Sequence, residues 1–179
     1  MSNNAIANER VIVFGASGFL GSHVADALSS AGYQVRLFDR SASPHLKPDQ
    51  EMIIGDIMNL DQVIEAARDC SIVYNFAAIA DIDEAHNKPI PTVTINVLGN
   101  MHVLEAARIA GARRFVFASS VYVYSESGSF YRASKQAAER FTETYHERYG
   151  LDYNILRYGS LSGRRADKRN GIYRMLLEA

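Results

Sequence analysis

The chain has 179 residues, of which 47% are hydrophobic and 22% are charged, so it is long enough for one domain with a packed core. Its net charge of −1 implies no general attraction to nucleic acid or to a membrane surface, and its single cysteine excludes an internal disulfide. The N-terminus is polar and no apolar run is long enough to span a bilayer, so we expect a cytoplasmic protein.

The first strand and helix predict a dinucleotide-binding turn. A buried strand is expected at Val11–Phe14 and a helix at Phe19–Ala31, with Gly15, Gly18 and Gly21 at intervals of three. In such a unit the first glycine turns the chain, the second admits a phosphate close to the backbone, and the third allows close helix packing. The N–H groups at the start of the helix then face the pyrophosphate.

The second strand, expected at Gln34–Phe38, is followed by Asp39. An acidic residue at this place holds the two ribose hydroxyls of adenosine, and its charge repels a 2′-phosphate. Asp39 therefore favours NAD over NADP. Arg40 leaves NADP open, because it could stack on adenine or receive a phosphate, and Asp39 itself could be a solvated strand end.

Strands and helices alternate along the rest of the chain. Further strands are expected at Met52–Ile54, Ser71–Asn75, Arg114–Ala118 and Tyr153–Leu156, further helices at Leu60–Arg68, Thr92–Ala110 and Tyr131–Tyr149, and loops at 41–50 and 76–91. This alternation predicts an α/β fold: a Rossmann-type doubly wound parallel sheet with strand order 3-2-1-4-5-6 and helices on both faces.

A second group of residues indicates proton transfer. Tyr131 and Lys135 are four apart at the start of a helix and share a face, and Ser120 follows the fifth strand. A neighbouring ammonium lowers the pKa of a phenol. A tyrosine tuned in this way exchanges a proton with an alcohol or a carbonyl as hydride moves to or from nicotinamide. The alternative is a tyrosine and a lysine on an exposed helix face.

Together these motifs resemble the short-chain dehydrogenase/reductase superfamily, specifically its extended branch of NAD-dependent nucleotide-sugar epimerases and dehydratases of the UDP-glucose 4-epimerase type. The resemblance covers roughly residues 10–165. The matching pieces are residues 15–21, Asp39, 55–57, 75–78, 96–99, 119–124, 131–135 and 157–158. So many pieces in the right order are far more specific than any one of them.

The resemblance implies an active site made of Ser120, Tyr131 and Lys135. Tyr131 is expected as the acid/base, Lys135 as the group that holds the nicotinamide ribose and lowers the tyrosine pKa, and Ser120 as a hydrogen-bond partner of the reacting oxygen. The expected cofactor-binding residues are Gly15, Ser17, Gly18, Phe19, Leu20, Gly21, Asp39, Arg40, Asp56, Ile57, Phe76, Ala77, Ala78, Asn96, Ser119, Tyr131, Lys135 and Tyr158. Asn96 could equally be a buried residue that bends its helix.

The implied reaction is epimerisation of a nucleotide sugar: hydride leaves a sugar carbon for NAD, a keto-sugar forms, and hydride returns. Dehydratases of this family carry an Asp-Glu pair where this chain has Val121 and Tyr122, which disfavours dehydration. Two alternatives remain. One is an alcohol dehydrogenase or ketone reductase of the same superfamily, and the other is a cofactor-binding fragment or sensor without turnover.

The chain departs from the family pattern in three places. Ser125–Phe130 is shorter than the usual proline-rich loop, and Ser160 stands where the family commonly has an asparagine. The family normally continues into a C-terminal substrate domain, so we expect residues 1–160 to form the NAD-binding domain and residues 161–179 to be the start of a truncated or missing second domain.

No metal site is expected, because the five histidines lack metal-ligand spacing. Asp81, Asp83 and Glu84 could bind a cation, but a solvated loop is the preferred interpretation. No partner other than the nucleotide-sugar substrate and a second copy of the chain is expected.

A homodimer is expected through the helices at 92–110 and 131–149. One face of each must cover the sheet, and both are rich in small residues that permit close helix approach. Enzymes that the chain resembles often pair these helices with their twofold mates. A charge at Met101 or Ala138 is then expected to split the dimer. The alternative is that the alanines are only good helix formers on a solvated face.

Overall fold

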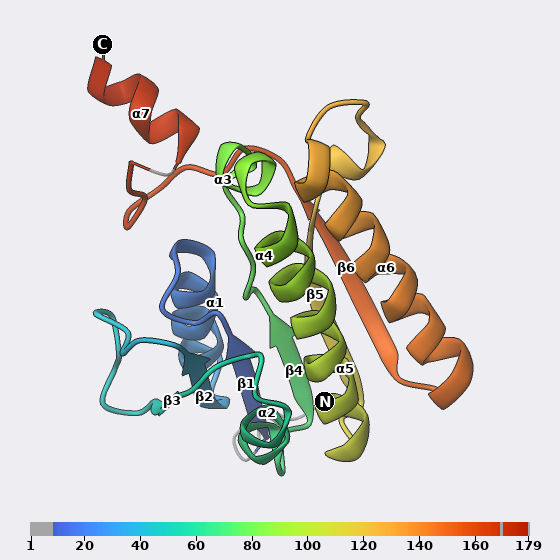
Figure 1. The fold of residues 1–179 in the computed structure, drawn as a ribbon. Helices are drawn as coiled ribbons and strands as arrows, with labels where there is room; N and C mark the ends of the chain where they lie inside the picture. The colour runs from blue at the N-terminus through green and yellow to red at the C-terminus, as the bar shows by residue number, and fades with distance from the viewer. Residues whose placement is uncertain (1–8, 169, 179) are drawn as a thin grey trace.

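The computed structural model describes residues 9–168 and 170–178, and its centre is a parallel sheet with helices on both faces (Figure 1). The strands are β1 Arg10–Phe14, β2 Gln34–Asp39, β3 Glu51–Ile54, β4 Ile72–Asn75, β5 Arg114–Ser120 and β6 Asp152–Tyr158. Their order is β3-β2-β1-β4-β5-β6, and every neighbouring pair is parallel. The predicted fold class and strand order are confirmed.

The helices divide between the two faces of the sheet. The helical segments are α1 Phe19–Ser30, α2 Leu60–Ala67, α3 Ile82–Asn87, α4 Pro89–Val93, the π-helical turn η1 Thr94–Leu98, α5 Gly99–Ile109, the 3₁₀ turn η2 Val121–Tyr124, α6 Ser129–Tyr149 and α7 Gly171–Glu178. Helices α2, α5 and α6 pack over one face, and α1 packs over the other. Figure 1 shows α5 and α6 side by side along the sheet.

Strand β1 is buried on both sides, which explains its continuous apolar sequence. Ile12 and Phe14 join the core beneath α2, α5 and α6. Val11 and Val13 point the other way, into the core beneath α1. Because alternate residues serve different faces, one strand anchors both layers and fixes the position of the turn that follows it.

The segment after β4 is more helical than the sequence predicted. Helix α3 forms where a loop was expected, because the Asp81 side chain accepts the backbone N–H of Glu84 at 2.8 Å and caps its first turn. Helix α4 begins at Pro89 rather than Thr92, since proline needs no N–H partner in a first turn. None of the helices among residues 9–168 and 170–178 has the length and apolar character needed to cross a membrane.

Strands β5 and β6 run further than predicted, up to the pair Ser120 and Tyr158. This pairing brings both residues to the carboxyl edge of the sheet. The turns after β1 and β4 open at the same edge, where ligands bind in sheets of this kind.

Candidate functional site

The turn between β1 and α1 is packed too closely for side chains at two of its glycines. Gly15 has a φ of +76°, and a Cβ there would lie 2.5 Å from the amide nitrogen of Ala77. A Cβ on Gly21 would lie 2.2 Å from the carbonyl oxygen of Gly15. Glycine is therefore required both for the left-handed turn and for the seating of α1 against it. The backbone at the N-terminus of α1 is left open to a ligand.

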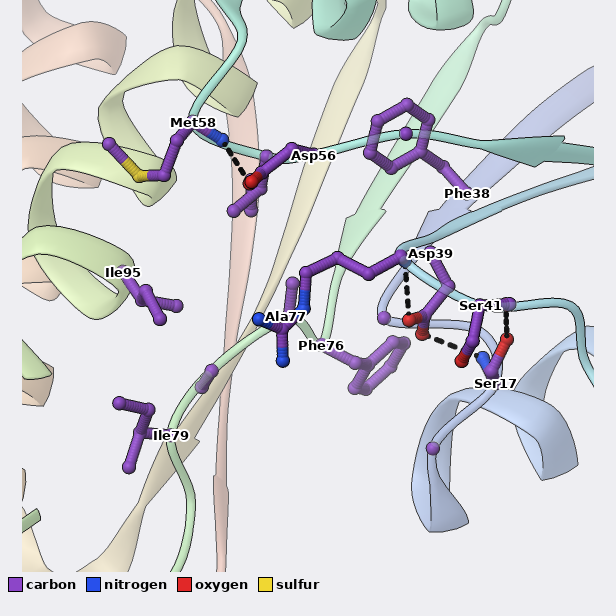
Figure 2. A pocket seen from close by; sticks show the side chains of 16 residues that line it. Ser17, Phe38, Asp39, Ser41, Asp56, Met58, Phe76, Ala77, Ile79 and Ile95 are labelled. Carbon is purple, nitrogen blue, oxygen red and sulfur yellow. Dashed lines mark hydrogen bonds between the residues drawn. The ribbon is translucent and has the colours of Figure 1, made fainter. Parts of the chain in front are cut away.

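The carboxylate of Asp39 is tied to this turn. It accepts the backbone N–H of Ser17 at 3.0 Å and that of Arg40 at 2.7 Å, and the Ser17 hydroxyl donates to the carbonyl oxygen of Ser41 at 2.7 Å. Figure 2 shows these bonds at one end of the pocket. The bonds fix the carboxylate beside the glycine turn and leave it capacity for further hydrogen bonds, because a carboxylate offers about four lone pairs.

A pocket of about 570 Å³ opens beside Asp39. Its lining residues are Gly15, Ser17, Gly18, Phe38, Asp39, Arg40, Ser41, Gly55, Asp56, Ile57, Met58, Phe76, Ala77, Ala78, Ile79 and Ile95. Met58, Ile79 and Ile95, which the sequence did not suggest, form an apolar wall at the end away from Ser17 (Figure 2). Asp56 shapes the loop after β3 by accepting the Met58 N–H at 2.9 Å.

A second pocket of about 510 Å³ contains the proposed active-site residues. Its lining residues include Phe19, Leu20, Gly21, Ser119, Ser120, Tyr131, Lys135 and Tyr158. The two pockets share Gly15, Gly18, Arg40, Phe76, Ala78 and Ile79, so they are two ends of one cleft. Every residue that the sequence suggested for the site lines this cleft except Asn96, although the individual roles stay predictions.

Asn96 is buried and lines neither pocket of the cleft, so of the residues suggested for the cofactor it is the one that the structure does not bring to the ligand's side. It is 2% exposed, and its side chain accepts the Ile79 N–H at 2.8 Å and donates to the Ile79 carbonyl and the Ser134 hydroxyl, each at 3.0 Å. These bonds use most of its polar capacity. Asn96 therefore holds the loop after β4 against α6. It is buried, as the alternative from the sequence had it, and it lies in the π-helical turn η1.

Lys135 is a buried cation at the base of the second pocket. Its ammonium donates to the carbonyl oxygen of Ala118 at 2.7 Å and lies 4.9 Å from the centre of the Phe117 ring. Burial lowers the pKa of Lys135 to about 8, and the nearby Glu139 carboxylate opposes that change. The ammonium is thus still mostly protonated at pH 7, but by a much smaller margin than an ordinary lysine.

The pKa of Tyr131 moves in the direction opposite to the prediction. Burial raises it above its ordinary value, and a hydrogen bond with Ser120 opposes the rise without cancelling it. Lys135 does not reverse this, because its ammonium is directed to Ala118 and lies 5.8 Å from the centre of the Tyr131 ring. Tyr131 is therefore a neutral phenol at pH 7 in this structure.

The acidic residues after β4 do not form a metal site. Asp81 caps α3, and Glu84 forms an ion pair with Lys88 at 3.0 Å. Within the part of the chain that the structure describes, no three His, Cys, Asp or Glu side chains gather in a way that could hold a metal ion.

Comparison with known proteins identifies relatives for nearly the whole chain. The family described as the NAD dependent epimerase/dehydratase family matches residues 11–179. A UDP-glucose 4-epimerase of Rhizobium leguminosarum bv. trifolii is 29% identical over 184 residues, which cover 93% of this chain and 56% of the relative.

Solved structures give the same result. The UDP-glucose 4-epimerase of Thermotoga maritima, solved with UDP-glucose, superposes with a TM-score of 0.87 at 25% identity over 94% of this chain and 62% of its own. That of Thermus thermophilus, solved with NAD, gives 0.84 at 29% identity over 92% and 60%. The chain thus spans little more than half the length of the proteins that it matches.

Proposed function

The chain belongs to the NAD-dependent epimerase/dehydratase family, and on that premise we propose that it binds NAD and acts on a nucleotide sugar as an epimerase. The observation that carries the proposal is the single cleft that joins the glycine turn and Asp39 at one end to Ser120, Tyr131 and Lys135 at the other. A substrate in this cleft could therefore contact a bound cofactor and a proton-transfer group at the same time.

The residues present fit NAD. Gly15, Gly18 and Gly21 line the cleft at the start of α1, and their lack of side chains suits a pyrophosphate there. Asp39 offers lone pairs for two ribose hydroxyls, and its charge opposes a 2′-phosphate. When bound, NAD supplies a hydride acceptor and donor for the sugar.

Side chains of this protein transfer the proton to and from the sugar oxygen. Tyr131, held as a phenol by burial, can donate a proton to a keto-sugar oxygen. To take a proton from a sugar hydroxyl it must first lose its own, which the positive charge of Lys135 favours. Ser120 hydrogen-bonds Tyr131 and lines the same pocket, which supports a role for its hydroxyl as the partner of the reacting oxygen. Epimerisation needs both steps: a proton leaves the sugar hydroxyl when the keto-sugar forms, and a proton returns to the same oxygen when the keto-sugar is reduced.

The test is interconversion of UDP-glucose and its 4-epimer by the protein with NAD, followed by chromatography. Tyr131→Phe should lower the rate by about 10²–10⁴-fold and leave NAD affinity nearly unchanged. Near-normal turnover by this variant would show that the acid/base assignment is wrong. Stoichiometric formation of NADH without epimer formation would instead indicate a dehydrogenase, which oxidises the sugar and does not return the hydride.

We also propose that the protein forms a homodimer through the outward faces of α5 and α6. Leu98, Ile109 and Phe141 are large apolar side chains exposed on η1, α5 and α6. Ala138, expected from the sequence at the interface, is fully buried in the core instead, so a charge there would unfold the protein rather than split a dimer. Phe141→Glu is the better probe.

Light scattering at micromolar concentration tests the dimer. The unmodified chain should show twice the monomer mass of 19.9 kDa, and Phe141→Glu should restore the monomer mass. A mass of 19.9 kDa for the unmodified chain would reject the dimer.

We further propose that residues 161–179 begin a region that contributes to substrate binding, as the sequence predicted. Leu161, Asp167 and Asn170 line the active-site end of the cleft. Helix α7 follows and leaves Met175 and Leu176 largely exposed. Protection of Leu161 and Asn170 from hydrogen exchange by UDP-glucose would support this role, and unchanged exchange at saturation would reject it. The cytoplasmic location stays a prediction.

A further inference from the structure

A buried carboxylate lies one helical turn beyond Lys135 on α6. Glu139 is 7% exposed, and its oxygens accept the Nε and Nη2 of Arg157 at 2.9 and 2.8 Å and the hydroxyl of Ser119. Burial alone would favour the neutral acid, but the hydrogen bonds from Arg157 and Ser119 hold the pKa of Glu139 below its ordinary value. Glu139 is therefore a fixed negative charge.

The end of β5 is tied to α6 at three successive residues. Lys135 bonds the carbonyl of Ala118, Glu139 bonds the hydroxyl of Ser119, and Tyr131 bonds Ser120. Helical spacing of four residues places the three α6 side chains on one face. Moving Glu139 would therefore disturb the strand residues that the lysine and the tyrosine use.

Several other charged and titratable groups lie around Lys135. Tyr131 shares its helix, residues 117–120 of β5 carry no ionisable side chain, and Arg157 on β6 pairs with Glu139. The same pocket is also lined by Arg40, Asp81, Glu84, Tyr158 and Asp167. Glu139 is the charge that supports the lysine's protonated form against burial.

We propose that Glu139 is a positioning residue for Lys135: held by Arg157, its charge keeps the buried ammonium protonated and directed at the end of β5. The inference rests on the proposed function, in which Lys135 must be a cation to hold a ribose and to favour loss of the Tyr131 proton. Arg157 acts one step further away, because it orients Glu139 and does not touch the lysine.

The experiment is a ¹³C NMR titration of the lysine side chains. The chain has four lysines, so the spectrum is simple, and Lys135→Met assigns the signal. Glu139→Gln keeps the shape and removes the charge, so the pKa of Lys135 should fall by about one unit or more. Glu143→Gln is the matched control, because Glu143 lies on the same helix but pairs with Arg140, whose side chain is 82% exposed. It should leave Lys135 unchanged.

Equal Lys135 titration in the unmodified protein and in Glu139→Gln would overturn the proposal. Glu139→Asp retains the charge, so the pKa of Lys135 should stay close to its value in the unmodified protein. A fall in that pKa as large as in Glu139→Gln would also overturn the proposal. If neither variant folds, the unmodified protein decides: the proposal requires Lys135 to be protonated at pH 7 with Glu139 in place, and a Lys135 pKa below about 7 would refute it. Because no cofactor is added, failure of NAD binding would count against the proposed function alone.

Discussion

The buried ammonium of Lys135 should make the protein gain stability in mild alkali, relative to Lys135→Met. Its pKa is about 8 in the folded chain and about 10.4 in an unfolded one. Below pH 8 the folded protein carries the full cost of this difference, about 3 kcal/mol at 1.36 kcal/mol per unit. By pH 9.5 the cost falls to about 1 kcal/mol, since the folded lysine is then neutral.

The sign follows from the protons bound. Between pH 8 and about 10.4 the unfolded chain binds more protons at this site than the folded chain, so the free energy of unfolding rises with pH. Lys135→Met also loses the hydrogen bond to Ala118, which costs about 1–3 kcal/mol if the carbonyl stays unpaired. The free energy lost with this hydrogen bond hardly changes with pH, so it cancels when the stability difference at one pH is subtracted from that at another.

The assay is urea unfolding followed by circular dichroism, because the chain has no tryptophan. The unfolding free energy of the unmodified protein, minus that of Lys135→Met, should increase by about 2 kcal/mol from pH 7 to pH 9.5. Other titrating groups are common to both proteins and cancel. A difference that stays constant within the error of extrapolation, about 10–15%, would refute the buried, perturbed lysine.

Two further substitutions test the packing of the site by urea unfolding. Gly21→Ala should destabilise by about 3 kcal/mol, because its Cβ would lie 2.2 Å from the Gly15 carbonyl oxygen. Gly99→Ala should cost less than about 1 kcal/mol, because its Cβ would meet only a side-chain methyl of Ile57, at 3.2 Å, and equal losses would contradict the close turn. Asn96→Ala should cost about 2 kcal/mol by leaving the Ile79 N–H and carbonyl unpaired, and a neutral result would show that water replaces the asparagine.

The glycine turn was predictable because its signal is local, and the sheet order was predictable because strands and helices alternate along the chain. Gly15 is needed for a positive φ in its own turn, and Asp39 follows its strand directly, so neither requires knowledge of distant packing. The helical turns before Thr92 were missed, because α3 depends on a cap from Asp81 and α4 begins at Pro89, where a loop was expected.

The electrostatics of the site could not be predicted from spacing. Four-residue spacing correctly placed Tyr131 and Lys135 together in the cleft but could not show that burial would raise the tyrosine pKa and lower that of the lysine. Lys135 and Glu139 are also four residues apart, so the sequence could have predicted that the two side chains share a helix face. Its partner Arg157 comes from β6 and becomes a neighbour only through the fold.

Calorimetric titration with NAD and NADP tests the central claim most directly. The protein should bind one NAD per chain and bind NADP more weakly, and Asp39→Ala should weaken NAD binding and narrow the gap between the two. The physical reason is that Asp39 combines free lone pairs with a charge that repels a 2′-phosphate. Absence of NAD binding, or NADP binding as tight as that of NAD, would contradict the account.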